Sequence, residues 1–353
     1  MIMKQMKKVI TAMTLTGLLA AGLETNVFAE ETVTELAEQK VTKHFVLAEG
    51  LDVPEEIFSF TAESEMEDAP EVTIGSVSYG STDNKGDLSS EGVYILDKTV
   101  DITFGTFPHA GLYEYTVTED CGNGENITYD PTSYELRVYV ANDENGQLVI
   151  QNMTAETDEG KHDSLSFTNT YRKTGNLTIT KNIVGELADK TKDFTFTIIF
   201  FKSGTEDSGI TSYTGYIGNE VVECAIGSEI RFELHDGQSL EFEELPVGTR
   251  YVVSEVGEED GYIPSVSVIE NNIQTVNGKD ATDSDDLSTA GSGSSNLVGE
   301  KENSVTFTNT YQNVPVTGVI VKHLPFLFLI VFPALALLLP VIVKIHKKLR
   351  GKL

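Results

Sequence analysis

The stretch VTFTNTYQ at residues 305–312 repeats an earlier stretch of the chain, LSFTNTYR at residues 165–172. Both contain FTNTY, and their asparagines, Asn169 and Asn309, lie 140 positions apart. In a chain of 353 residues, this repeat indicates two similar units, each long enough to bury a core of its own. Because each FTNTY segment reads as the strand that completes its unit, we predict a tandem of two domains.

Short runs of alternating apolar and polar residues fill both units, as expected for half-buried β-strands. The clearest runs are residues 112–119, 133–140, 177–183, 194–200 and 250–256. Long amphipathic helical patterns are missing from the sequence. We therefore predict an all-β protein made of two tandem β-sandwiches.

The predicted domains are residues 33–172 and residues 173–312, with the boundary near Lys173 and Gly175. Residues 277–299 are rich in Gly, Ser and Asp. That composition predicts a loop within the second domain, because a predicted strand follows it.

The charge of the chain limits its partners. Residues 30–317 contain 16 basic and 54 acidic residues, a net charge of −38. Such a surface repels phosphates, so we expect neither nucleic acid nor an anionic membrane as partner. Cys121 and Cys224 fall in different domains, which leaves no intradomain disulfide. The spacing of His and Cys supports no metal site, and we expect no cofactor.

The N-terminal residues 1–29 resemble a secretory signal peptide. Three lysines in the first eight residues precede an apolar stretch, and Val27 and Ala29 are small residues suited to a signal-peptidase site. We predict export with cleavage after Ala29. The alternative is an uncleaved N-terminal anchor.

The C-terminal residues form a second targeting signal. VPVTG at residues 314–318 precedes an apolar segment, residues 319–343, and a basic tail, residues 344–353. The apolar segment is long enough to span a bilayer with the tail in the cytoplasm. This order resembles the cell-wall sorting signal of Gram-positive surface proteins, although valine replaces the leading leucine of the usual LPxTG motif. The resemblance implies that a sortase cleaves between Thr317 and Gly318. The alternative is a plain membrane anchor.

Each unit carries a lysine, a glutamate and an asparagine in the same order: Lys43, Glu119 and Asn169 in the first, and Lys181, Glu255 and Asn309 in the second. Residues two apart on a strand share a face, and each of the six has apolar neighbours at that spacing. All six are therefore predicted to lie on apolar faces, where an unpaired charge is costly.

A spontaneous Lys–Asn amide bond would resolve this cost. Burial lowers the pKa of a lysine and raises that of a glutamate. A neutral amine can then attack the asparagine carbonyl while the glutamic acid polarises it and shuttles protons, with loss of ammonia. We predict bonds Lys43–Asn169 and Lys181–Asn309, promoted by Glu119 and Glu255. Each bond would join the first and last strands of its unit and carry a pulling force.

Each residue type also has a simpler interpretation. A strand lysine commonly extends its ammonium to solvent, a glutamate at a strand end stays solvated, and asparagine before threonine makes turns. In the first unit, Lys40 competes with Lys43 but lies on the opposite face.

At these residues the sequence resembles the streptococcal pilin isopeptide-linkage family, the backbone subunits of Gram-positive pili, over roughly residues 33–312. The resemblance implies immunoglobulin-like β-sandwiches stacked end to end. LPVGT at residues 245–249 is similar to related adhesin stalk domains, whereas the first unit has FPHAG at residues 107–111. Similar pilins place their polymerising lysine near the position of Lys161. The alternative for Lys161 is an ordinary solvated lysine in a turn.

The predicted function is that of a structural protein on the cell surface, the shaft subunit of a sortase-assembled pilus. Its predicted partners are the sortase and, covalently, peptidoglycan or other pilin subunits. The alternative is a monomeric wall-anchored adhesin that binds a host or matrix ligand. The sequence contains no catalytic triad or metal motif, so no enzymatic activity is predicted.

Overall fold

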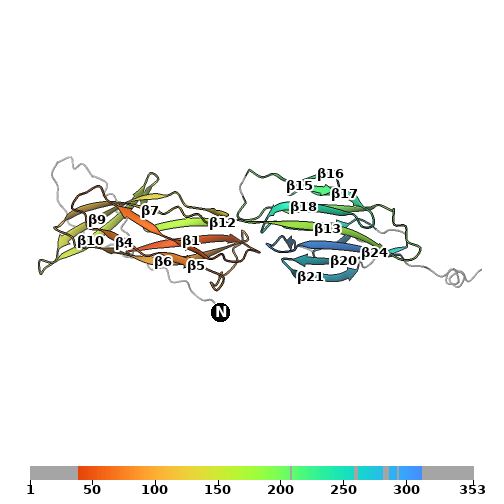
Figure 1. Cartoon of the computed structure of the whole chain (residues 1–353), viewed down its shortest axis with the longest axis horizontal. Helices are drawn as coiled ribbons and strands as arrows, with labels where there is room; N and C mark the ends of the chain where they lie inside the picture. Colours follow the sequence, from red (N-terminus) through yellow and green to blue (C-terminus); the bar gives the residue numbers. More distant parts are fainter. Residues whose placement is uncertain (1–38, 207–208, 258–260, 281–285, 292–293, 312–353) are drawn as a thin grey trace, which may run out of the picture.

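The computed structural model describes residues 39–206, 209–257, 261–280, 286–291 and 294–311. These residues form two β-sandwich domains that lie end to end (Figure 1), which confirms the predicted fold class. The signal peptide, the VPVTG motif, the apolar segment and the basic tail predicted from the sequence lie outside the described residues. Within the described residues, no helix is both long and apolar enough to cross a membrane.

The first domain packs two five-stranded sheets against each other, in the orders β4-β6-β1-β12-β8 and β11-β10-β9-β7-β3. The strands of the first sheet are β1 (Lys40–Ala48), β4 (Val72–Ile74), β6 (Val93–Phe104), β8 (Ile127–Thr128) and β12 (Leu165–Tyr171). Those of the second are β3 (Phe60–Glu63), β7 (Gly111–Glu119), β9 (Ser133–Asn142), β10 (Leu148–Thr157) and β11 (Gly160–His162). Two short strands, β2 (Glu56–Phe58) and β5 (Val77–Tyr79), pair separately.

The second domain has a seven-stranded sheet, β16-β15-β18-β13-β24-β20-β21, and a smaller sheet, β17-β14-β19-β22, with β23 also paired to β19. The strands of the larger sheet are β13 (Thr174–Val184), β15 (Ser212–Ile217), β16 (Glu220–Ala225), β18 (Ser239–Pro246), β20 (Tyr262–Glu270), β21 (Ile273–Asp280) and β24 (Ser304–Tyr311). The smaller sheet contains β14 (Phe194–Phe201), β17 (Ile230–Leu234), β19 (Arg250–Glu255), β22 (Leu287–Ser288) and β23 (Asn296–Leu297).

In both domains the first strand pairs in parallel with the last. β1 runs beside β12 with Lys43 opposite Phe167, and β13 runs beside β24 with Lys181 opposite Phe307. Alternate residues of these strands point into the space between the sheets and are buried there, which produces the period-two burial of each strand. The repeated FTNTY segment is therefore the last strand of each domain, as predicted.

The prediction of a loop over residues 277–299 is wrong at three places in that stretch. β21 continues to Asp280, and both β22 and β23 pair with β19. Asp, Ser and Gly have low strand propensity, but pairing with neighbouring strands outweighs this preference. Residues 281–285 and 292–293 lie outside the described residues.

The two domains meet through the segment that follows β1. The Gly50 carbonyl accepts hydrogen bonds from the Glu300 N–H and the Asn271 side chain, at 3.3 Å each. Gly50 has φ of +92°, and an added Cβ would lie 3.1 Å from Cα of Gly299, so only glycine fits at this close approach. Val247 of the second domain joins the buried apolar cluster of the first.

Ion pairs surround this joint. Two of them cross between the domains, Glu49 with Arg250 and Asp52 with Lys301, and Lys173 at the domain boundary pairs with Glu300 beside them. Each pair keeps part of its side chains in solvent, so the individual contributions are about 1 kcal/mol or less. Together with the buried contact, they fix the orientation of one domain on the other.

Candidate functional sites

The first domain brings Lys43, Glu119 and Asn169 together in its core. Lys43 and Asn169 are fully buried, and Glu119 is 6% exposed. The Lys43 amine lies 2.9 Å from each carboxylate oxygen of Glu119. The Asn169 side chain donates from Nδ2 to Oε1 of Glu119 at 2.8 Å. The glutamate thus connects the amine to the amide nitrogen that would leave.

Strand geometry places the three residues. Lys43 sits on β1 opposite Phe167 of β12, so Asn169 lies two positions further along the same face. Glu119 ends β7 in the facing sheet, and its side chain crosses the space between the sheets. The lysine and asparagine are therefore neighbours on adjacent strands, and the carboxyl group approaches both from the opposite layer.

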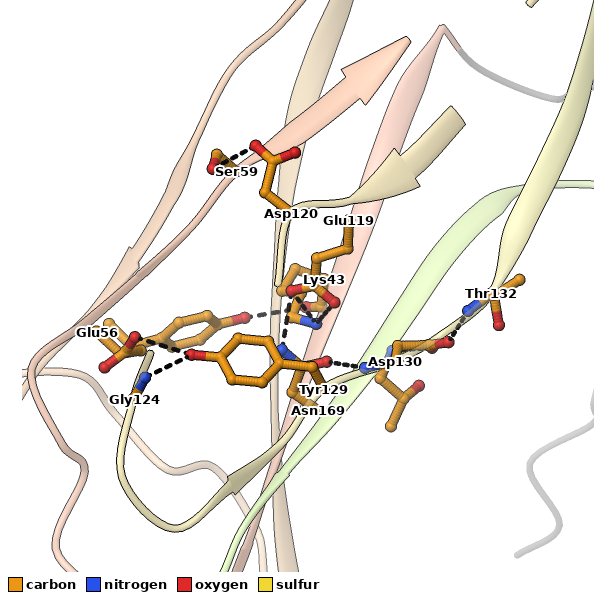
Figure 2. A network of polar contacts seen from close by, with 12 residues as sticks. Lys43, Glu56, Ser59, Glu119, Asp120, Gly124, Tyr129, Asp130, Thr132 and Asn169 are labelled. Atoms are coloured by element: carbon orange, nitrogen blue, oxygen red, sulfur yellow. Dashed lines mark hydrogen bonds and ion pairs between the residues drawn. The ribbon is translucent and has the colours of Figure 1, made fainter. Parts of the chain in front are cut away.

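The asparagine carbonyl oxygen has a separate partner. The backbone N–H of Asp130 donates to Oδ1 of Asn169 at 2.8 Å (Figure 2). The Asp130 carboxylate in turn accepts the backbone N–H groups of Thr132 and Thr168. The predicted polarisation of the carbonyl by the glutamate is not seen: Glu119 contacts the nitrogen of this amide, and the Asp130 N–H contacts its oxygen.

Burial changes the ionisation of the pair. Loss of solvent lowers the pKa of the Lys43 amine, an effect that its contact with Glu119 opposes. Loss of solvent raises the pKa of the Glu119 carboxyl, again against the effect of the lysine. Both shifts favour the uncharged pair, an amine beside a carboxylic acid. The ring of Phe58 lies 4.7 Å from Nζ of Lys43 and helps to keep water away.

The second domain repeats the arrangement. Lys181 and Asn309 are fully buried, and Glu255 is 2% exposed. Lys181 Nζ lies 3.0 Å from both oxygens of Glu255, and Asn309 Nδ2 donates to Glu255 Oε1 at 2.5 Å. The ring of Phe194 lies 4.1 Å from the amine. Unlike its counterpart in the first domain, the Asn309 Oδ1 atom is buried with no hydrogen-bond partner among the described residues.

The other residues singled out from the sequence lie apart from these sites. Lys161 is exposed on β11, and the competing Lys40 is only half-buried at the start of β1. Cys121 is exposed and Cys224 is buried, both as free thiols. No group of His, Cys, Asp and Glu within the described residues is arranged to hold a metal ion. Thr317 and Gly318 lie outside the described residues.

Asp130 is a residue of this site that the sequence pattern did not predict. The sequence predicts part of this arrangement, because Asp130 precedes Pro131 and such a pair commonly begins a turn. The sequence does not predict the direction of the Asp130 N–H group, because this direction depends on where β8 ends beside β12.

Comparison with protein families assigns the domain that holds Lys43, Glu119 and Asn169. Residues 39–172 match the family described as Spy0128-like isopeptide containing domain. The first domain is similar to this family along its whole length. Residues 175–311, which hold the second trio, match a family described as a domain of unknown function, DUF7601. The Spy0128-like domain and its neighbour therefore share an arrangement that only one of the two family descriptions mentions.

Relatives and solved structures extend the comparison beyond the Spy0128-like domain. A protein named pilin from Streptococcus pyogenes serotype M1 is 27% identical over 335 residues, covering 89% of this chain and 93% of the relative. The pilus tip adhesin Cpa of S. pyogenes is 34% identical over 145 residues, which cover 41% of this chain and 18% of the adhesin. A major pilin structure from S. pyogenes is 25% identical, with 79% of this chain and 99% of that chain covered and a TM-score of 0.36. The major pilin T3.2 from the same species is 23% identical, with coverage of 79% and 100% and a TM-score of 0.37.

Proposed function

We propose that this protein is the shaft subunit of a sortase-assembled pilus, strengthened by one self-formed Lys–Asn amide bond in each domain. The observation that carries the proposal is the buried Lys–Glu–Asn trio, which occurs in both domains and spans their first and last strands. The pilin relative, matched over 93% of its length, supports the same role. The function is structural, and the chain forms the two internal bonds on itself.

The bond-forming step follows from the contacts in the first domain. Nζ of Lys43 attacks Cγ of Asn169, and the bond from Cγ to Nδ2 breaks. Glu119, in contact with both nitrogens, accepts a proton from Nζ and delivers one to Nδ2, so that ammonia leaves. The product is an uncharged amide, so the core no longer holds a buried amine that could ionise. In the second domain, Lys181, Glu255 and Asn309 take the same roles.

Polymerisation requires a donor and an acceptor at opposite ends of the subunit. Lys161 lies on β11, just before β12, and β12 runs from that end toward the second domain. β24 ends at Tyr311, at the far end of the second domain (Figure 1). In the proposed fibre a sortase cleaves after Thr317 and joins its carbonyl to Nζ of Lys161 of the next subunit. The last subunit is joined to the cell-wall peptidoglycan instead.

A denaturing gel of wall extracts tests polymerisation. The wild-type protein is expected to run as a ladder of high molecular weight. Lys161→Ala should abolish the ladder and leave monomer on the wall, while Lys202→Ala, which removes an exposed lysine from the second domain, should leave the ladder intact. A ladder that survives Lys161→Ala would move the acceptor to another lysine. Wild-type protein found only as wall-bound monomer would favour an adhesin that binds a host or matrix ligand.

Mass spectrometry of the mature C-terminus tests the sorting step. Peptides from wall-fraction protein should end at Thr317, joined to an amine of peptidoglycan or of another subunit. Intact peptides that run through Thr317 and Gly318 in that fraction would contradict sortase processing.

A further inference from the structure

The two buried trios differ at the carbonyl oxygen that would carry negative charge during bond formation. In the first domain, the Asp130 N–H already donates to Asn169 Oδ1 at 2.8 Å. In the second, within the part of the chain that the structure describes, the corresponding oxygen of Asn309 is buried without a partner. The lysine and glutamate contacts are otherwise alike.

The difference arises from the strand that flanks the asparagine. β8 pairs with β12 over only two residues, with Thr128 opposite Thr170. The same register, continued by two residues, sets Asp130 opposite Thr168. At this point the chain has left the strand ladder and turns at Pro131, so the N–H of Asp130 is available to the Asn169 side chain.

The second domain has a complete strand in this place. β20 pairs with β24 along its length, with Pro264 opposite Asn309 and Ser265 opposite Thr308. Proline has no N–H to donate. Ser265, the counterpart of Asp130 by register, remains in the ladder, and its hydroxyl donates to the Thr308 carbonyl at 3.2 Å. Among the described residues, no backbone donor is therefore directed at the amide oxygen of Asn309.

The Asp130 side chain fixes the position of its own N–H. Oδ1 accepts the Thr132 N–H at 2.9 Å, and Oδ2 accepts the Thr168 N–H at 2.6 Å. The first contact stabilises the turn after Asp130, and the second ties that turn to the residue directly before Asn169. The carboxylate thus holds the donor in place before any reaction begins.

We propose that Asp130 is a positioning residue for the Lys43–Asn169 bond, and that this bond forms faster than the Lys181–Asn309 bond. The inference rests on the proposed self-catalysed amide bonds. When Nζ of Lys43 adds to Cγ of Asn169, negative charge gathers on Oδ1, where the Asp130 N–H stabilises it. As the Cγ–Nδ2 bond breaks, Oδ1 returns to a carbonyl and ammonia leaves. A preorganised donor at such an oxygen changes a rate by about 100-fold or more.

The test follows both bonds in one molecule. Residues 30–317 include every contact described above and are made by cell-free translation. Synthesis is stopped, and samples are denatured at intervals and digested. Mass spectrometry then measures the linked peptide that contains Lys43 and Asn169, and separately the one that contains Lys181 and Asn309. Each linkage is recognised by the loss of one ammonia.

Asp130→Ala is expected to slow the first bond by at least about tenfold, because the N–H loses its tether, and to leave the rate of the second unchanged. Asp130→Asn keeps one acceptor oxygen and should give an intermediate rate. Ser265→Ala is the matched control and should leave the rates of both bonds unchanged. Limited proteolysis of each variant checks that the first domain is folded.

The outcomes separate the two proposals. Absence of both linked peptides from the wild-type protein would refute the amide bonds themselves. With both present, an unchanged first-bond rate in folded Asp130→Ala would overturn only the role of Asp130. A rate for Asp130→Asn as low as that for Asp130→Ala would assign the effect to charge and overturn positioning. Equal rates for the two wild-type bonds would overturn the predicted difference between domains.

Discussion

Replacing Asn169 with alanine isolates the contribution of the first cross-link. The substitution removes the acceptor of the proposed bond but leaves the contact between the Lys43 amine and the Glu119 carboxyl group, so the buried amine keeps its partner. The bond would close a loop of 126 positions. In the chain-entropy model, closing such a loop stabilises the folded state by about 5 kcal/mol, an upper figure because strain subtracts from it.

One smaller effect acts in the same direction. The Asp130 N–H loses its acceptor, which costs about 1 kcal/mol. For a domain of about 130 residues, a total of about 5–6 kcal/mol corresponds to a fall in melting temperature of roughly 15–20 °C. Differential scanning calorimetry of residues 30–317 would measure this fall, and the transition of the second domain should change much less.

Asn152→Ala provides the control, since it removes an amide from β10 of the same domain without touching the trio. Intact mass must be measured beside the melting temperature. If Asn169→Ala reduced the deficit from the sequence mass by one ammonia but left the melting temperature of the first domain unchanged, the entropic account of the cross-link would be wrong. If the mass showed no lost linkage, the bond itself would be refuted.

Three further results are expected. Glu255→Ala should prevent only the second bond, so the intact mass of residues 30–317 should fall short of the sequence value by one ammonia instead of two. A deficit of two ammonia molecules in that variant would rule out a role for Glu255. The rate at which the first bond forms should be highest over a plateau at intermediate pH. It should fall at low pH, where the Lys43 amine gains a proton despite its lowered pKa. It should also fall at high pH, where the Glu119 carboxyl loses its proton despite its raised pKa. A pH-independent rate measured by linked-peptide mass spectrometry would contradict this. Arg250→Ala should loosen the joint beside Glu49 and broaden the interdomain distances seen by small-angle X-ray scattering, with an energetic cost of about 1 kcal/mol or less. An unchanged distance distribution would show that the joint keeps its geometry without the ion pair between Glu49 and Arg250.

Much of the fold could be predicted because its signals are local. The alternation in residues 112–119 and 133–140 directly reflects burial of one strand face, and the observed strands β7 and β9 extend these ranges only slightly. The same parity predicted burial of Lys43 and Asn169, since an apolar residue two positions away places both on the inner face.

The parts of the fold and of the site that the sequence did not predict depend on residues that are distant in the sequence. β22 and β23 are two residues long and exist because β19 pairs with them, which the composition of residues 277–299 does not reveal. Asp130 was missed for a related reason: its role depends on the early end of β8 beside Asn169. The different carbonyl environments of the two domains likewise come from sheet registers, although the trio residues are identical in type.

A fibre of these subunits would contain two kinds of joint along its axis. Within each subunit, the joint around Gly50 combines a tight backbone contact with a buried Val247 and flanking ion pairs, so it resists tilting. Between subunits, the proposed link runs from Thr317 through the long side chain of Lys161 and contains many rotatable bonds. Curvature should therefore concentrate at every second joint, and the bending compliance of the whole fibre should be set by the junctions that the sortase makes.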